Sequence, residues 1–158
     1  MTSKIEWSEA VWNPTTGCTQ IVLHPERLSM PMRWKKSRLI VVNSTSDLFH
    51  EAIPDEFIAE VFAVMALTPW HTYQVSTKRP ERMREFCSRE AHWWGNKAMR
   101  RIKQFDDRIR FNREIYGKPL PNVWFGARPG NKLEDLPEDL RVREYPDVAV
   151  LSRAEEVS

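Results

Sequence analysis

A chain of 158 residues is long enough to form one domain with its own hydrophobic core. Its hydrophobic content of 41% and its seven tryptophans exclude wholesale disorder. The sequence has no apolar run of membrane-spanning length, no signal-peptide pattern and only two cysteines. We therefore expect a cytoplasmic protein without a disulfide framework and without membrane association.

The formal net charge is only +2, but the charge is unevenly distributed. Residues 79–118 carry 12 Lys/Arg against 6 Asp/Glu, whereas residues 131–158 carry 4 against 8. The second segment is also poor in residues that could be buried. It predicts a loosely ordered acidic tail that follows a single α/β domain at residues 1–130.

The first 36 residues give weak structural signals. Turn residues at 13–17 predict that a short first strand or extended arm ends in a loop that carries Cys18. A lone cysteine in a turn is typically a small buried side chain. Residues 21–36 show little periodicity, so we expect an irregular segment anchored by Trp34.

Three short apolar segments, residues 38–42, 72–76 and 122–126, have the composition of buried strands. A helical pattern separates the first two: it begins at Pro54, buries one broad apolar face and stops at residues 68–69. Strands that alternate with helices predict an α/β fold with a parallel sheet.

Two further helices are expected between the second and third strands. The first begins at Pro80 and directs Met83, Phe86 and Cys87 inward, which makes Cys87 a core thiol. The second is capped by Asn96 and lies in a helical insertion at residues 88–118. A basic stripe with two flanking tryptophans is expected there: Trp93, Trp94, Lys97, Arg100, Arg101, Lys103, Arg108, Arg110 and Arg113. Such a stripe is usually just a solvated face; its sharper interpretation is a surface for a partner or for nucleic acid.

Polar residues follow the first two buried strands, where the functional edge of a parallel sheet is expected. These candidate ligand-binding residues are Asn43, Ser44, Ser46, Asp47, His50, Thr77, Lys78 and Arg79. Asp47 and His50 have the chemistry for acid–base catalysis, and Lys78 with Arg79 for anion binding. The alternative is that Ser46 or Asp47 caps a turn and that His50 is partly buried, and we favour it because no nucleophile or metal-ligand set accompanies them.

Several segments together resemble a phage- and prophage-associated protein family related to radical-SAM enzymes. The resemblance covers most of residues 4–86 and 119–126. The segments that carry it are Ile5-Glu6-Trp7, Trp12-Asn13-Pro14, Thr16-Gly17-Cys18, Pro25-Glu26-Arg27-Leu28, Arg33-Trp34, residues 42–50, Pro54-Asp55-Glu56-Phe57, residues 77–83 and Leu120-Pro121-Asn122-Val123-Trp124. It implies a partial parallel α/β barrel, an iron–sulfur cluster and SAM.

The departures from this family concern the metal chemistry. The family has three cysteines that would bind a cluster, but here Cys18 is followed by residues 19–24 without a second cysteine. A cluster takes three or four ligands, so Cys18 is at most a remnant ligand, and His24 is a poor substitute. The later strands of the family are also missing after Phe125. We expect a truncated relative that has no cofactor.

Three functions remain open at this stage. The preferred one is a non-catalytic phage or mobile-element protein that binds a protein partner. The phage context suggests inhibition of a host nucleic-acid-guided defence complex, in the manner of an anti-CRISPR protein. A half-built barrel also leaves a strand edge that a partner or a second copy, as in a homodimer, could cover. The alternatives are a residual radical-SAM-like or nucleotide-dependent enzyme, and a nucleic-acid-binding protein that uses the basic helix at 97–113.

Overall fold

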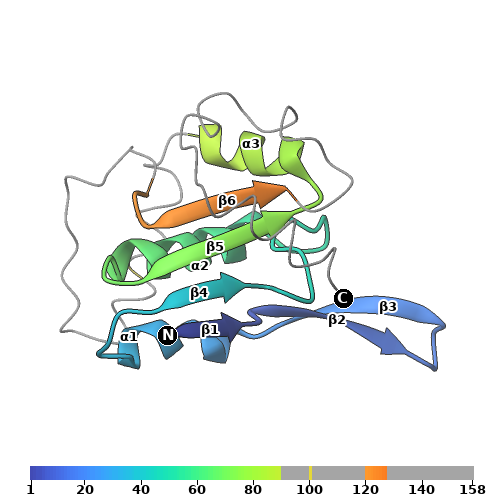
Figure 1. Cartoon of the computed structure of the whole chain (residues 1–158). Coiled ribbons are helices and arrows are strands. Elements are labelled where there is room, and N and C mark those ends of the chain that lie inside the picture. Colours follow the sequence, from blue (N-terminus) through green and yellow to red (C-terminus); the bar gives the residue numbers. More distant parts are fainter. Residues whose placement is uncertain (90–99, 101–119, 128–158) are drawn as a thin grey trace, which may run out of the picture.

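The computed structural model of the chain describes residues 1–89, 100 and 120–127. Four strands form a parallel sheet: β1 (Thr2–Ile5), β4 (Leu39–Val42), β5 (Thr72–Thr77) and β6 (Val123–Ala127), in the order β1-β4-β5-β6. A separate antiparallel hairpin consists of β2 (Ser8–Asn13) and β3 (Cys18–Leu23). The helices are η1 (Pro25–Arg27), α1 (Met30–Arg33), α2 (Asp55–Leu67) and α3 (Pro80–Ser88) (Figure 1).

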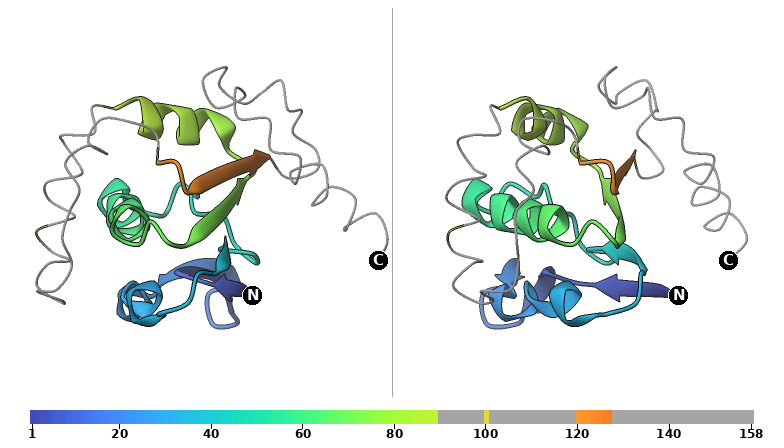
Figure 2. Two further views of the ribbon diagram at one scale, coloured as in Figure 1. Left: turned by 60° about the vertical axis from the view of Figure 1, so that its left-hand side comes forward. Right: turned by 90° about the vertical axis from the view of Figure 1, so that its left-hand side faces the viewer.

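This arrangement confirms the predicted α/β fold class. Each parallel strand lies beside the preceding one, and the helices lie on one face of the sheet (Figure 2). Sequential parallel strands with helices on one face are the arrangement from which α/β barrels are built. The acidic tail and the predicted basic helical insertion, apart from residues 88, 89 and 100, lie outside the described residues.

The register of the sheet sets the core. Ile40, Tyr73 and Val123 are direct neighbours across three strands, and Val42 and Val75 occupy the next row on the same face. All five side chains are at most 2% exposed. Because side chains alternate along a strand, these rows direct every second residue toward the helices.

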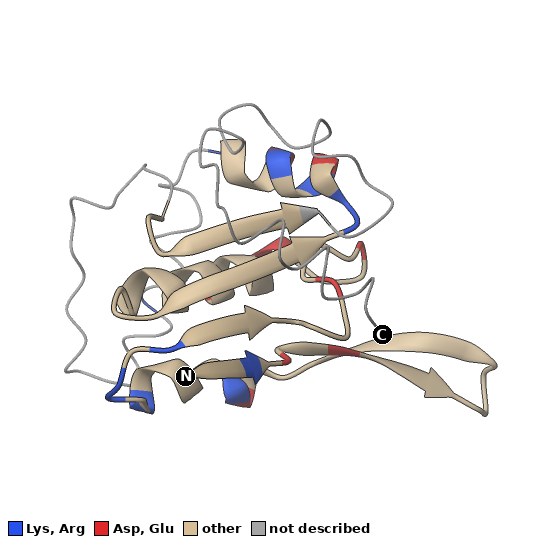
Figure 3. Ribbon diagram, viewed as in Figure 1, with Lys and Arg blue, Asp and Glu red and all other residues tan. Residues whose placement is uncertain are grey.

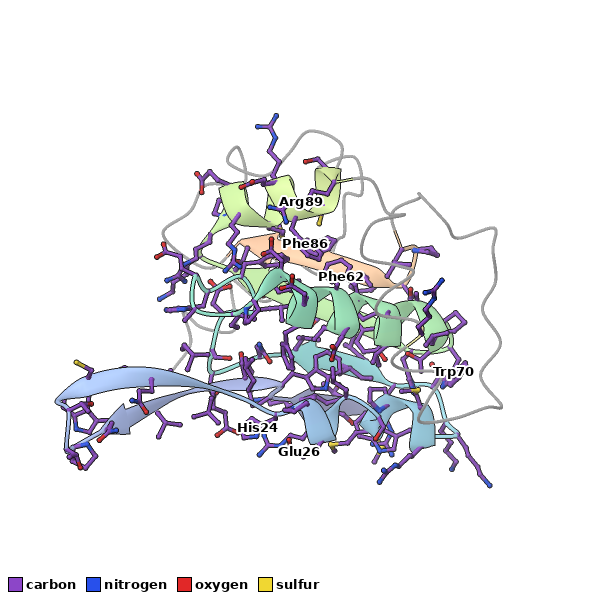
Figure 4. All side chains as sticks on the ribbon, turned by 180° about the vertical axis from the view of Figure 1, so that it is seen from behind. His24, Glu26, Phe62, Trp70, Phe86 and Arg89 are labelled. Atoms are coloured by element: carbon purple, nitrogen blue, oxygen red, sulfur yellow. The ribbon has the colours of Figure 1, made fainter. Side chains whose placement is uncertain are left out.

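Phenylalanines fill the space between the helices and the sheet. The rings of Phe62 on α2 and Phe86 on α3 are 5.2 Å apart, and Phe49 contacts Phe86 edge-on at 6.1 Å (Figure 4). The predicted inward face of α3 is confirmed for Met83 and Phe86, whereas Cys87 is half-buried and packs against the core.

Helix α2 begins where the sequence predicts. Asp55 and Glu56 occupy its first turn, where the positive end of the helix dipole stabilises their negative charges. At the other end, Thr68 is the C-terminal cap residue, and its hydroxyl donates to the carbonyl of Val64. All residues from 57 to 67 are buried, so burial extends beyond the single apolar face that was expected.

The prediction for residues 21–36 was wrong, because they are not irregular throughout. The first three belong to β3, and η1 and α1 follow. A four-residue loop joins β2 to β3: the Asn13 side chain accepts hydrogen bonds from the backbone of Thr15 and Thr16, and Gly17 has a φ of +66°. The β-branched residues after Gly17 then pair with β2, and this pairing could not be read from the periodicity of either segment alone.

Cys18 also differs from its prediction as a buried residue in a turn. It is the first residue of β3, paired with Asn13, and it is exposed. The hairpin extends past the sheet and helices (Figure 1), and Cys18 is not among the described residues that pack against the core.

Among the described residues, no helix is long and apolar enough to cross a membrane.

His71 joins the amino ends of β4 and β5. The backbone N–H of Arg38 donates to its Nδ1 at 3.1 Å, and its Nε2 lies 2.9 Å from the carbonyl oxygen of Pro31. Nδ1 must therefore be unprotonated and Nε2–H the donor. Trp34, the predicted anchor, packs against the core and contacts the His71 ring edge-on at 6.0 Å.

This geometry predicts a pH-dependent stability. Burial lowers the pKa of His71, with a smaller contribution from the charge of Arg38. As the pH falls below about 6.5, the unfolded chain binds a proton before the folded chain does, so the free energy of unfolding falls, by at most about 1.4 kcal/mol per pH unit. Urea unfolding between pH 7.5 and 5.5 should show this loss, and His71→Asn should flatten it while His50→Asn leaves it in place. An unchanged slope in His71→Asn would contradict the assignment.

Candidate functional site

The structure brings most of the predicted polar residues together at the carboxyl ends of three adjacent strands. Residues 6–8 follow β1, residues 43–47 follow β4, and residues 77–79 are the last residue of β5 and the two that follow it. We call these three segments the strand-outlet network. Its side chains bind mainly the backbone and side chains of the neighbouring segments.

Asn43 connects the outlet of β4 to that of β1. Its side chain is fully buried, and its Oδ1 accepts hydrogen bonds from the backbone of Trp7 (2.8 Å) and Ser8 (3.4 Å). Its Nδ2 donates to the Ser8 hydroxyl at 2.8 Å. Asn43 has a φ of +50°, a left-handed conformation that asparagine tolerates better than most residues. Its position is therefore explained by the bonds that it makes to the start of β2.

Two serines extend the same connection. The Ser46 hydroxyl donates to the carbonyl of Ser8 at 2.7 Å, and the Ser44 hydroxyl donates to the carboxylate of Glu6 at 2.5 Å. The backbone N–H of Thr45 also donates to Glu6. Glu6, which the sequence analysis did not single out, is therefore part of the network.

Asp47 connects the outlet of β4 to that of β5. One carboxylate oxygen accepts from the backbone of Phe49 (3.0 Å) and from the hydroxyl of Thr77 (2.8 Å). The other accepts from the backbone of Lys78 (2.8 Å) and from the guanidinium of Arg79 (3.3 Å). Asp47 is 7% exposed, so it is a buried carboxylate with four internal donors. This is the geometry of the capping alternative, extended across two strands.

The other predicted residues have different surroundings. His50 is partly buried, and its Nδ1 accepts from the backbone of Ala52 at 3.1 Å. Arg79 pairs with Asp47, so its charge is already partly compensated inside the protein. The Asp47 carboxylate is directed to the β5 outlet while the His50 ring binds its own loop, and the two therefore do not share a hydrogen bond.

Arg82 is a structural residue that the sequence analysis missed. It extends from α3 and donates to the carbonyls of Phe49, His50 and Ile53, and to the carboxylate of Asp55 at 2.9 Å. In the sequence, Arg82 is one of several arginines that follow Pro80, and no local pattern distinguishes it from an arginine that is merely solvated. Partial burial raises the pKa of Asp55, but the bonds from Arg89 and Arg82 lower it overall.

Of the predicted basic stripe, only Arg100 lies among the described residues. It is helical and exposed. Trp93, Trp94, Lys97, Arg101, Lys103, Arg108, Arg110 and Arg113 lie outside them.

The donor set does not fit an iron–sulfur cluster. Cys18 is exposed on the hairpin, whereas Cys87 packs against the core from α3. A single thiolate leaves most ligand positions of a cluster empty. The described part of the chain also contains no group of three His, Cys, Asp or Glu residues that could hold a metal ion.

The hairpin of β2 and β3, which we call the arm, extends past the carboxyl ends of the parallel strands (Figure 1). Trp12, Val11 and Val22 are 61%, 43% and 40% exposed. Trp12 lies on the same face as Ile21 and Leu23, both of which pack against the core at the base of the arm. The apolar face that anchors the arm thus continues outward onto an exposed tryptophan.

A second set of contacts holds the base of the arm. The Arg27 guanidinium donates to the Glu9 carboxylate at 2.7 Å and to the carbonyl of Glu6, and His24 lies between Glu9 and Glu26 (Figure 4). The bond from Arg27 and the charges of Arg27 and His24 lower the pKa of Glu9. The base of the arm is therefore fixed on both sides, by the strand-outlet network and by η1.

Fold and site together define a parallel α/β protein with an internally bonded strand-outlet network and an exposed arm. The chain belongs to the family described as "Protein of unknown function (DUF5131)", whose model matches residues 19–146. The match begins in β3, so it includes the outlets of β4 and β5 and excludes β1 and β2. Neither a curated protein nor a solved structure matches the chain.

Proposed function

We propose that this protein acts in the cytoplasm, without catalysis, by binding a protein partner through the arm. The observation that carries the proposal is the exposure of Trp12 on a hairpin whose base is fixed by Asn43 and Arg27. Exposed tryptophan on a rigid support is typical of binding hot spots, because it offers a large contact area at a small entropic cost.

The internal bonding of the strand outlets supports the non-catalytic part of the proposal. A catalytic carboxylate must reach a substrate proton or a reacting atom. The oxygens of Asp47 already accept four internal hydrogen bonds, and Asn43 is fully buried. We therefore assign these two side chains to positioning the arm and the loops around it.

The partner that we propose is a host nucleic-acid-guided defence complex, which the protein would inhibit in the manner of an anti-CRISPR protein. This part of the proposal depends on the resemblance to phage- and prophage-associated proteins. A second copy of the chain is the competing partner, since exposed hairpins can also pair with each other.

Replacing Trp12 with serine is expected to weaken the complex at least about thirtyfold, the effect of losing one hot-spot residue. Trp12 is mostly exposed, so the free energy of unfolding should change by no more than about 0.5 kcal/mol. The affinity is measured by titrating purified wild type and variant against purified defence complexes. Sedimentation of the protein alone gives its oligomeric state.

The matched control is Met30→Ser, an exposed apolar residue on α1 away from the arm. It should bind like the wild type. Equal binding by Trp12→Ser and wild type would contradict the arm as the binding surface. If the wild type sediments as a dimer and Trp12→Ser as a monomer, the partner of the arm is a second copy of the chain and not a different protein.

A further inference from the structure

A second exposed surface lies at the amino ends of the parallel strands, opposite the strand-outlet network. It consists of the last residue of α1, the segment between α1 and β4, and the residue that precedes His71. Its side chains are Arg33, Trp34, Lys35, Lys36, Arg38 and Trp70. We call it the amino-end surface, and we propose that it binds single-stranded nucleic acid.

The charges of this surface are not compensated within the described residues. Four cations occur between positions 33 and 38 without an acid, and none forms an ion pair with a described carboxylate (Figure 3). At the strand outlets and α3, by contrast, Arg79, Arg82 and Arg89 each pair with an aspartate. Arg33, Lys35 and Lys36 are exposed, whereas Arg38 is half-buried and donates to the Ser3 hydroxyl. Exposed cations without carboxylate partners attract a polyanion, and releasing its counterions favours binding.

An aromatic side chain stands beside these cations. Trp70 is 44% exposed and lies at the end of the molecule away from the arm (Figure 4). Nε2 of His71 carries a hydrogen, which it donates to the carbonyl of Pro31, so it cannot accept a hydrogen bond from Trp70. The Trp70 indole N–H therefore donates to the carbonyl of Trp34 at 3.3 Å. The indole edge is thus held by the protein while part of the ring remains accessible.

The backbone of the surface is fixed as well. The Ser37 hydroxyl donates to the carbonyl of Trp70 at 2.6 Å, and the backbone of Thr72 donates to the carbonyl of Arg38 at 2.9 Å. The Arg38 guanidinium lies 4.3 Å from the centre of the Trp34 ring. The backbone that carries the cations and the exposed ring is therefore held in one arrangement before a ligand arrives, which lowers the entropic cost of binding.

Single-stranded nucleic acid fits this surface better than other polyanions. Its phosphates pair with lysine and arginine, and its unpaired bases stack on aromatic rings irrespective of sequence. A duplex hides its base faces, and an acidic peptide offers no flat ring to stack on Trp70. This inference is independent of the arm and does not depend on the proposed protein partner.

The test is fluorescence anisotropy of the full chain with labelled 15-mers of dT and of U at 50 and 200 mM salt. Lys35→Glu/Lys36→Glu should weaken binding at least about tenfold and reduce the slope of log K against log salt by about 1.4, the loss of two phosphate contacts. Trp70→Leu should weaken it at least about fivefold, the lower limit for one lost base stack.

The matched control is Lys4→Glu/Arg84→Glu, which changes the net charge equally at exposed positions on β1 and α3. It should bind within about twofold of the wild type, and urea unfolding should confirm that every variant is folded. Several results would overturn the proposal: no binding at 50 mM salt, equal loss in the control, or loss only with Arg100→Glu/Arg101→Glu. Binding of polyglutamate without binding of either oligonucleotide would assign the surface to an acidic protein instead.

Discussion

Replacing Asp47 with alanine is expected to lower the free energy of unfolding by about 3–5 kcal/mol, the cost of removing one partner from a buried charged network. The substitution removes the acceptor of four hydrogen bonds, which come from the backbone N–H groups of Phe49 and Lys78, the hydroxyl of Thr77 and the partly exposed guanidinium of Arg79. Phe49 and Thr77 are fully buried, so water cannot easily replace the carboxylate. Urea unfolding followed by far-UV circular dichroism measures the loss.

Arg79→Ala is the control for the ionic part of this effect. The Arg79 side chain is one-third exposed, and its loss leaves Asp47 with three internal donors, so we expect a change of only about 1 kcal/mol. A loss below 1 kcal/mol in Asp47→Ala would contradict the structural role of the carboxylate. It would then favour Asp47 as a residue held in place for a ligand.

Trp7→Ala is expected to cost a similar 3–5 kcal/mol, the usual range for emptying a large core position. Trp7 is fully buried, its ring stacks on Tyr73 at 6.3 Å, and its indole N–H donates to the carbonyl of Arg27 at 3.1 Å. Trp7 thus lies where the first parallel strand, the start of the arm and η1 meet, and it contributes contacts that hold them together. The same unfolding measurement applies, with the arm residue Trp12 as a comparison five positions away.

Trp12→Ala should leave the free energy of unfolding within about 0.5 kcal/mol of the wild type. Comparing the losses of unfolding free energy in the two tryptophan variants tests whether the arm is separate from the hydrophobic core. Similar losses in both variants would contradict it, because the arm would then contribute to the core.

The sequence was sufficient to predict three of the four parallel strands, but not the place of β1 in the sheet. The strands at 38–42 and 72–76 are short β-branched runs bounded by polar residues, and α2 has a helical repeat of apolar residues between two prolines. These signals are local, so they survive in a single sequence. The hairpin was missed because its evidence is the pairing of two weak segments, each largely exposed, across the loop at 14–17.

Most members of the candidate site were predicted, and the capping interpretation that the sequence favoured agrees with the internal bonds of Asp47. The position of polar residues after two neighbouring buried strands correctly placed Asp47 beside the β5 outlet. The contact of Asn43 with the β1 outlet was not predicted, because no parallel strand was expected at residues 2–5. Asparagine and aspartate can equally bind a ligand or the backbone, and composition does not distinguish the two. Glu6 and Arg82 were missed because their partners are distant in sequence and consist largely of backbone groups.

The strand-outlet network holds the base of the arm, and amide hydrogen exchange of the Asn43→Gly variant is the first experiment that should test this role. Glycine accepts the positive φ of position 43, so the variant removes the side-chain bonds to Trp7 and Ser8 without adding strain. Peptides that cover β2 and β3 should exchange at least about tenfold faster than in the wild type, while peptides from α2 keep their protection. Unchanged exchange in the arm, or equal acceleration in α2, would contradict the account.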